Sequence, residues 1–136
     1  MADLKDLCGV ENTVFQAGMG GIAGPELAAS VSNAGGLGHL GGIRMAANDI
    51  KNWIQQTKSL TDAPFGINLV PMGPGPDGFD AQLSVVFAEK PKVLSLFWGD
   101  FSTIIPRAKE AGITTMVQVG SVAAAKQAAK DGADII

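Results

Sequence analysis

A glycine-rich turn near the N-terminus is the segment best suited to hold a ligand. It reads Ala17-Gly18-Met19-Gly20-Gly21 and stands between a short apolar run and a segment with helical spacing. Glycine lets a backbone approach a planar or anionic group closely, which favours a binding role, although a flexible loop without a ligand would have the same composition. The turn is not the dinucleotide-binding fingerprint, because Ala23 stands where that pattern requires its third glycine.

Side chains near the ends of later apolar runs could complete such a site. Asn68 follows Gly66-Ile67 in the third run; Asn is uncommon in strands, and its amide offers two donors and an acceptor to a ligand or to a loop backbone. Gln118 holds the same place in the fifth run, with its facing direction undetermined. Gln16, inside the first run, could equally be a buried polar group satisfied by the protein. Phe97-Trp98 could wall a flat apolar pocket or belong to the core.

The single histidine, His39, is a weaker candidate for chemistry. It lies in the second apolar run with no acid, cysteine or serine pattern beside it, so a structural role is favoured over catalysis. The sequence has no metal-ligand spacing, no nucleophile elbow and no Walker motif. We therefore predict no metal site and no catalytic residue of these classes in the 136 residues.

Repeated strand–helix units would position these residues. Apolar runs begin near residues 14, 37, 65, 93, 114 and 133, and the intervals of 19 to 28 residues suit βα units. The runs are nearly continuous in apolar character, as in strands covered on both faces. Either a doubly wound sheet or a (β/α)₈ barrel fits this periodicity, and in both folds ligands bind at the carboxyl ends of the strands. Helical patterns fill the intervals over residues 25–32, 45–58, 80–89, 104–111 and 122–130.

Composition indicates one globular domain over residues 1–136. Apolar residues make up 46% and charged residues 17%, and a net charge of −3 with a pI near 4.9 argues against a nucleic-acid partner. No stretch has the roughly 18 apolar residues of a membrane span, and the N-terminus does not have the pattern of a secretory signal. With one cysteine, Cys8, a reducing cytoplasm is the simplest location. Because the sixth run stops at Ile136, we expect the chain to be a truncated or partly observed piece of a larger protein.

Several of these segments together resemble the nitronate monooxygenases, formerly called 2-nitropropane dioxygenases. The resemblance spans nearly the whole chain, and its motifs are fairly specific. It is carried by Val14-Phe15-Gln16-Ala17-Gly18-Met19, Pro25-Glu26-Leu27-Ala28-Ala29, Val31-Ser32-Asn33-Ala34-Gly35-Gly36-Leu37-Gly38, Phe65-Gly66-Ile67-Asn68-Leu69, Ala111-Gly112-Ile113, Gln118-Val119-Gly120-Ser121 and Asp131-Gly132-Ala133-Asp134.

The resemblance implies a TIM-type (β/α)₈ barrel, of which this chain would supply the first five βα units and the start of strand six. It implies non-covalent FMN at the carboxyl ends of the strands and oxidation of alkyl nitronates by O₂ to a carbonyl compound and nitrite. The backbone of Ala17, Gly18, Met19 and Gly20 would lie against the flavin, Asn68 would hydrogen-bond it, and Gln118 would lie near the ring. Two alternatives stay open: an enoyl-acyl-carrier-protein reductase II type of enzyme that uses NAD(P)H, or an inactive half-barrel.

The resemblance also implies which functional parts this chain lacks. The family's expected catalytic base is the His of a Gln-Gly-x-Glu-Ala-Gly-Gly-His segment on strand six, which we expect beyond Ile136, as we do the phosphate-binding glycines. His39 does not match that histidine. Fungal-type members carry a histidine where this chain has Phe97, so we do not place it in that branch. The implied partners are a nitronate or related small molecule and O₂, without nucleic acid or membrane.

Overall fold

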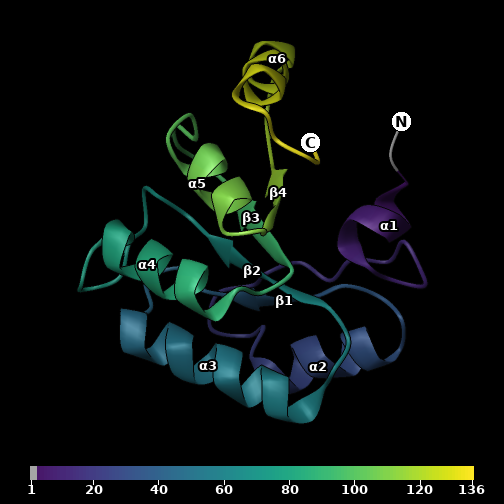
Figure 1. Cartoon of the computed structure of the whole chain (residues 1–136). Coiled ribbons are helices and arrows are strands. Elements are labelled where there is room, and N and C mark those ends of the chain that lie inside the picture. The colour runs from purple at the N-terminus through teal and green to yellow at the C-terminus, as the bar shows by residue number, and fades with distance from the viewer. Residues whose placement is uncertain (1–2) are drawn as a thin grey trace.

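Four parallel strands form a sheet in the order in which they occur along the chain (Figure 1). The structure is a computed structural model that describes residues 3–136. The strands are β1 (Gly38–Gly41), β2 (Phe65–Leu69), β3 (Val93–Leu96) and β4 (Thr114–Val117). The helices are α1 (Leu4–Cys8), α2 (Pro25–Asn33), α3 (Ala47–Leu60), α4 (Phe79–Glu89), α5 (Ile104–Glu110) and α6 (Val122–Asp131).

The predicted first and sixth strands are each reduced to a single parallel bridge. Phe15 bridges Leu37 beside β1, and Ile135 bridges Met116 beside β4. After Phe15 the chain enters the glycine-rich turn, so no second pair of residues forms a backbone bridge with β1. Beside β4, the Asp134 carboxylate accepts the Thr115 amide hydrogen at 2.8 Å. The first strand is therefore shorter than predicted, whereas only the start of strand six was expected, and both segments lie where the repeat requires them.

The order of the segments decides between the two candidate folds. Counting both bridges, six parallel segments lie side by side in chain order without a reversal. A doubly wound sheet reverses its strand order at the point where its ligand binds, whereas a barrel keeps the order of the chain. The arrangement is therefore that of consecutive βα units of a barrel, as the resemblance implied.

Local sequence signals explain where the helices begin and end. Pro25 opens α2, and the Ser121 hydroxyl accepts the Ala124 amide hydrogen at the start of α6. Gly132, with φ of 91°, ends α6. The five helical patterns of the sequence correspond to α2–α6. The short helix α1 was not predicted; the Asp3 carboxylate caps it by accepting the Lys5 amide hydrogen.

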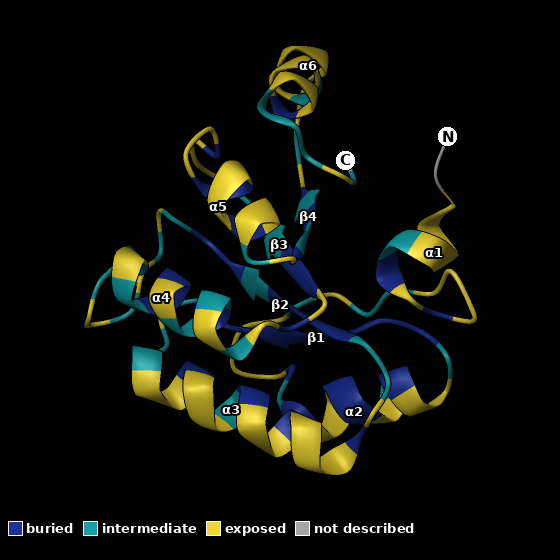
Figure 2. Ribbon diagram, viewed as in Figure 1, coloured by how far each residue is buried: buried dark blue, intermediate teal, exposed yellow. Residues whose placement is uncertain are grey.

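The main core lies between the sheet and the helices that cover one of its faces. Leu40, Ile67 and Leu94 point from the strands into this layer and are almost fully buried. From the helices come Ile50 and Ile54 of α3, which have the spacing expected for one helix face. Figure 2 shows the same division, with buried strands and helices exposed on their outer sides. Because successive side chains of a strand point to opposite faces, the intervening strand residues lie on the other face of the sheet.

That second face has an apolar end and a polar end. At the amino ends of the strands, Cys8, Val10, Leu37 and Val93 form a small buried cluster beside α1. Toward the carboxyl ends, polar side chains replace the apolar ones. Within residues 3–136 no helix is long and apolar enough to cross a membrane, and no three His, Cys, Asp or Glu side chains are grouped as metal ligands.

Candidate functional site

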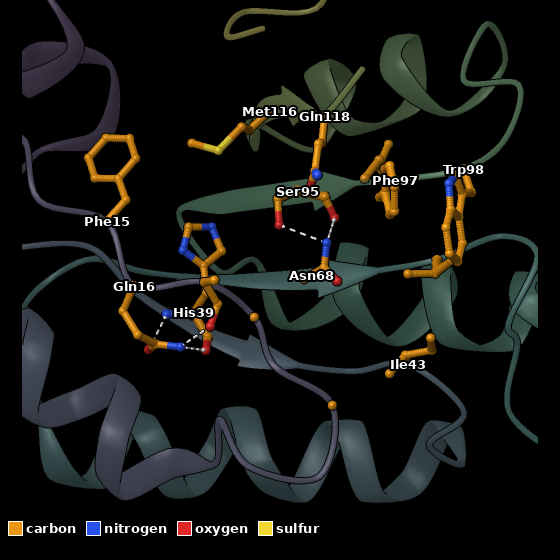
Figure 3. A pocket seen from close by; sticks show the side chains of 15 residues that line it. Phe15, Gln16, His39, Ile43, Asn68, Ser95, Phe97, Trp98, Met116 and Gln118 are labelled. Carbon is orange, nitrogen blue, oxygen red and sulfur yellow. Dashed lines mark hydrogen bonds between the residues drawn. The ribbon is translucent and has the colours of Figure 1, made fainter. Parts of the chain in front are cut away.

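A cavity of about 460 Å³ opens at the carboxyl ends of the strands (Figure 3). Its volume lies in the range of roughly 300–1,000 Å³ that small-molecule and cofactor sites occupy. Every parallel segment from the first run to β4 contributes to its wall. The lining residues are Phe15, Gln16, Ala17, Gly18, Gly20, His39, Ile43, Asn68, Val70, Ser95, Leu96, Phe97, Trp98, Met116 and Gln118.

The structure brings five of the six predicted cofactor-binding residues to this wall. Ala17, Gly18, Gly20, Asn68 and Gln118 line the cavity. The sixth, at position 19, does not. Its carbonyl accepts hydrogen bonds from the Ile22 and Ala23 amides in the turn before α2, and its side chain is 40% exposed. Contact of any of the six with a cofactor remains a prediction.

Asn68 is held by the neighbouring strand. Its Nδ2 donates to the Ser95 carbonyl at 3.3 Å and to Ser95 Oγ at 3.2 Å, as the register that pairs these two residues allows. Because a carbonyl can only accept, this contact sets the orientation of the amide. No group within residues 3–136 donates to Asn68 Oδ1. The half-buried oxygen is therefore a free acceptor on the cavity wall.

Glycine at position 18 is required by the protein itself. A Cβ built on Gly18 would lie 2.4 Å from Asn68 Cβ and 3.0 Å from the Leu40 carbonyl oxygen. A Cβ on Gly20 would lie 2.3 Å from Ile43 Cγ2. We expected these glycines to let the turn approach a ligand, but at both positions the close neighbour is a side chain of the barrel segment. The turn is thus packed tightly against the residues that flank the cavity.

The sequence left two interpretations of Gln16, a ligand-binding residue or a polar group satisfied by the protein. The structure supports the second. Its Oε1 accepts the His39 amide hydrogen at 3.0 Å, and its Nε2 donates to the His39 carbonyl at 3.1 Å and to the Ala17 carbonyl. The side chain therefore replaces the backbone pairing that the first run does not make with β1. Its hydrogen-bonding groups are used by the protein.

Gln118 and the aromatic pair shape the mouth of the cavity. Gln118 is exposed and extends over it from the end of β4 (Figure 3). Phe97 and Trp98 stack with ring centroids 4.4 Å apart. Trp98 is 60% exposed and has φ of 53°, a strained conformation that cavities and ligand sites often contain. Both aromatic residues line the cavity, so the pocket-wall interpretation holds for them.

The functional candidate that sequence reasoning set aside is His39. Its side chain lines the floor of the cavity yet is only 3% exposed, and neither ring nitrogen has a hydrogen-bond partner. Burial lowers the pKa of His39 to about 4, although the nearby Leu37 and Gln16 backbones partly offset this effect. The imidazole is therefore neutral at physiological pH.

A glycine in the next strand makes room for this ring. A Cβ on Gly66, the register partner of His39, would lie 2.5 Å from His39 Nε2. Glycine inside a strand often marks such a close approach, so the pairing of a histidine with a strand glycine was the available sequence signal.

A run of βα units with a mostly apolar cavity at the carboxyl ends of its strands defines the ligand-binding side of a barrel enzyme. Comparison with known proteins identifies which family of barrels. The sequence model of the nitronate monooxygenase family matches residues 2–76, and the chain belongs to this family. Proteins of the family and its relatives are oxidoreductases.

Individual relatives point to more than one substrate class. The chain is 36% identical over 98% of its length to a Rhodococcus jostii protein named (3aS,4S,5R,7aS)-5-hydroxy-7a-methyl-1-oxo-octahydro-1H-indene-4-carboxyl-CoA dehydrogenase, and spans 37% of that protein. It is 30% identical over 98% of its length to a nitronate monooxygenase of Paraburkholderia phytofirmans, and spans 46% of it. The structure of FabK from Thermotoga maritima matches 96% of the chain with a TM-score of 0.90 and 33% identity, over 41% of FabK. The chain thus spans less than half of each relative.

Proposed function

We propose that this chain forms part of the cofactor site of an FMN-dependent oxidoreductase that oxidises alkyl nitronates with O₂ to a carbonyl compound and nitrite. The observation that carries the proposal is the cavity at which the Gly18 turn, Asn68 and Ser95 converge, in a chain of the nitronate monooxygenase family. The Paraburkholderia relative, matched along nearly the whole chain, supports the nitronate as substrate.

The residues of the cavity fit a flavin ring. An isoalloxazine has an apolar benzenoid end and an amide-like end that needs hydrogen bonds. The wall is largely apolar, and its stacked aromatic pair, Phe97 and Trp98, suits a flat ring. Asn68 Oδ1 is a free acceptor, and the Ser95 hydroxyl, which already accepts from Asn68, keeps its own hydrogen to donate.

The residues of this chain would bind and orient the cofactor, and FMN when bound would supply the electron transfer. Asn68 would hold the amide-like edge, the backbone of the turn at residues 17–20 would lie against the ring, and Gln118 would cover it from the mouth. The low pKa of His39 makes it a weak base at neutral pH. His39 is therefore a poor candidate for the catalytic base of this reaction.

A second candidate function is oxidation or reduction of an acyl thioester with a nicotinamide as electron partner. The specific observation in its favour is the 36% identity, over 98% of this chain, with the carboxyl-CoA dehydrogenase of Rhodococcus jostii. An enzyme of the enoyl-acyl-carrier-protein reductase II type belongs to the same candidate. Both functions would use the same flavin site, so they differ in substrate and electron partner only.

Two assays on the purified protein separate these functions. Oxygen uptake driven by propyl-2-nitronate without nicotinamide, with nitrite released, supports the first function. Oxidation of NADH or NADPH that requires an enoyl thioester, without uptake of oxygen on nitronate, overturns it in favour of the second. A protein that binds no flavin in either assay supports the inactive half-barrel. The same assays on protein stripped of flavin, before and after FMN is added back, are the control.

A further inference from the structure

The cavity contains a buried side chain whose hydrogen-bonding groups the described protein does not use. His39 is 3% exposed, and both Nδ1 and Nε2 lack a partner within residues 3–136. Buried polar groups in native proteins nearly always have partners, so an orphaned pair of ring nitrogens calls for one. The ring lies on the face of the sheet that holds the cavity, not on the face that the helices cover (Figure 3).

The Leu37 and Gln16 backbones lie close enough to the His39 ring to raise its pKa, but neither makes a well-formed hydrogen bond with a ring nitrogen. Gln16 binds the backbone N–H and C=O of His39, which fixes this residue at the edge of β1. Gly66 leaves the space beneath the ring, since a Cβ there would lie 2.5 Å from Nε2. His39 and its glycine partner thus place an imidazole with two buried, unpaired nitrogens against the cavity.

The chemistry of the floor indicates what the partner must offer. A neutral imidazole has one N–H donor and one acceptor nitrogen. Among the described residues that line the cavity, His39 is the only titratable one, so no carboxylate or amine there competes for it. Asn68 Oδ1 is a second free group, two residues nearer the carboxyl end of its strand than the register partner of His39. A ligand that binds both needs hydrogen-bonding atoms at two positions, which the polar edge of a flat heteroaromatic ring can supply.

We propose that His39 is a cofactor-binding residue, whose imidazole forms a hydrogen bond with a ring atom of the flavin that occupies this cavity. The proposal rests on the proposed flavin site and adds a residue that the family resemblance did not assign. It distinguishes His39 from a packing residue, which would tolerate an apolar side chain of similar size.

The test measures the affinity of the flavin-stripped protein for FMN by quenching of flavin fluorescence. His39→Leu removes both nitrogens, His39→Asn keeps a polar group near the position of Nδ1, and His39→Gln keeps one near Nε2. We expect the Kd for FMN to rise about tenfold in His39→Leu and to be partly restored in one of the polar variants. Riboflavin, which lacks the phosphate, serves as a second probe and should show the same fold-change, because the contact is to the ring.

A spectroscopic measurement guards against loss of affinity through misfolding. Long-range ¹H–¹⁵N spectra of the wild type minus His39→Asn isolate the ring nitrogens of His39. We expect at least one of these ¹⁵N shifts to change when FMN is added to the wild type. If FMN binds with unchanged His39 shifts and with equal Kd in wild type and His39→Leu, the proposal for His39 is overturned and the flavin site stands. If the wild type binds neither FMN nor riboflavin, both proposals fail.

Discussion

Gly18 packs directly against the side chain of Asn68, fifty residues further along the chain. The Cβ that any other residue would place at position 18 would lie 2.4 Å from Asn68 Cβ, well inside contact distance. Asn68 is held from its other side by Ser95. The positions of the Gly18 turn and of the Asn68 side chain therefore depend on each other, so a change in one residue should displace the other.

Replacing Gly18 by alanine tests this relationship. Since the new methyl group meets a β-carbon and the Leu40 carbonyl, which cannot rotate away, we expect a loss of about 1–3 kcal/mol in the free energy of unfolding. Urea denaturation followed by circular dichroism measures it. The Kd for FMN should rise as well, because Asn68 is displaced.

Gly120→Ala is the matched control for this substitution. Position 120 also lies in a loop at the carboxyl end of a strand, but a Cβ there would meet nothing within 4 Å. We expect its stability and FMN affinity to remain close to those of the wild type. Equal effects of the two substitutions would contradict the packing of Gly18 on Asn68 as the cause.

Gln16→Leu should destabilise the junction between the first run and β1. The substitution removes the side-chain acceptor of the His39 amide hydrogen and the donor to its carbonyl, and thus leaves buried backbone groups unpaired. We expect a cost of about 1–3 kcal/mol in urea denaturation. Gln127→Leu is the control, because Gln127 bonds only to Asp131 on the exposed side of α6. If Gln16→Leu unfolds at the same urea concentration as the wild type, the stability of β1 does not depend on the Gln16 side chain.

The stability of the protein should fall as the pH drops below the ordinary pKa of histidine. Burial lowers the pKa of His39 from 6.5 to about 4, so the unfolded chain binds a proton in this range and the folded protein does not. Stability is therefore unaffected by His39 above pH 6.5, decreases as the pH falls toward 4, and levels off below that. From pH 7.5 to 5.0 the loss due to His39 should be about 2 kcal/mol.

His39→Leu provides the comparison for this effect, because other groups also titrate between these pH values. The difference in unfolding free energy between wild type and variant should shift by about 2 kcal/mol in favour of the variant as the pH is lowered from 7.5 to 5.0. A difference that stays constant across this interval would mean that His39 titrates normally and that its ring is solvated.

Much of the fold could be predicted because each repeat has its own local signals. Pro25 at a helix start, Ser121 as a cap and Gly132 as a stop depend on neighbours in sequence, and all three have the predicted role. The strand predicted at residues 14–17 is shorter in the structure, because its apolar residues do not reveal that Gln16 pairs with β1 through its side chain. The choice of barrel over doubly wound sheet required the spatial order of the strands or a family resemblance, since periodicity is the same in both.

The location of the site could be predicted from the sequence, but the contacts between its residues could not. The rule that ligands bind at the carboxyl ends of strands placed Gly18 and Asn68 correctly on the cavity wall. The reason for Gly18 was different from the expected one, because only coordinates show that Asn68 occupies the space of its missing side chain. A structural role was predicted for His39 because no acid, cysteine or serine lies beside it in the sequence. The space that its ring occupies is left by Gly66, which lies in another strand.

The most direct test of the flavin site is the affinity of FMN for the wild type and for Asn68→Ala. The wild type should quench the fluorescence of added FMN to saturation. Asn68→Ala, which loses the free acceptor on the wall, should bind FMN roughly three- to tenfold more weakly, the worth of about one hydrogen bond. Asn48→Ala, at an exposed position of α3, should bind FMN like the wild type. Absence of binding in the wild type, or equal Kd values for FMN in all three proteins, would contradict the assignment of this cavity as a flavin site.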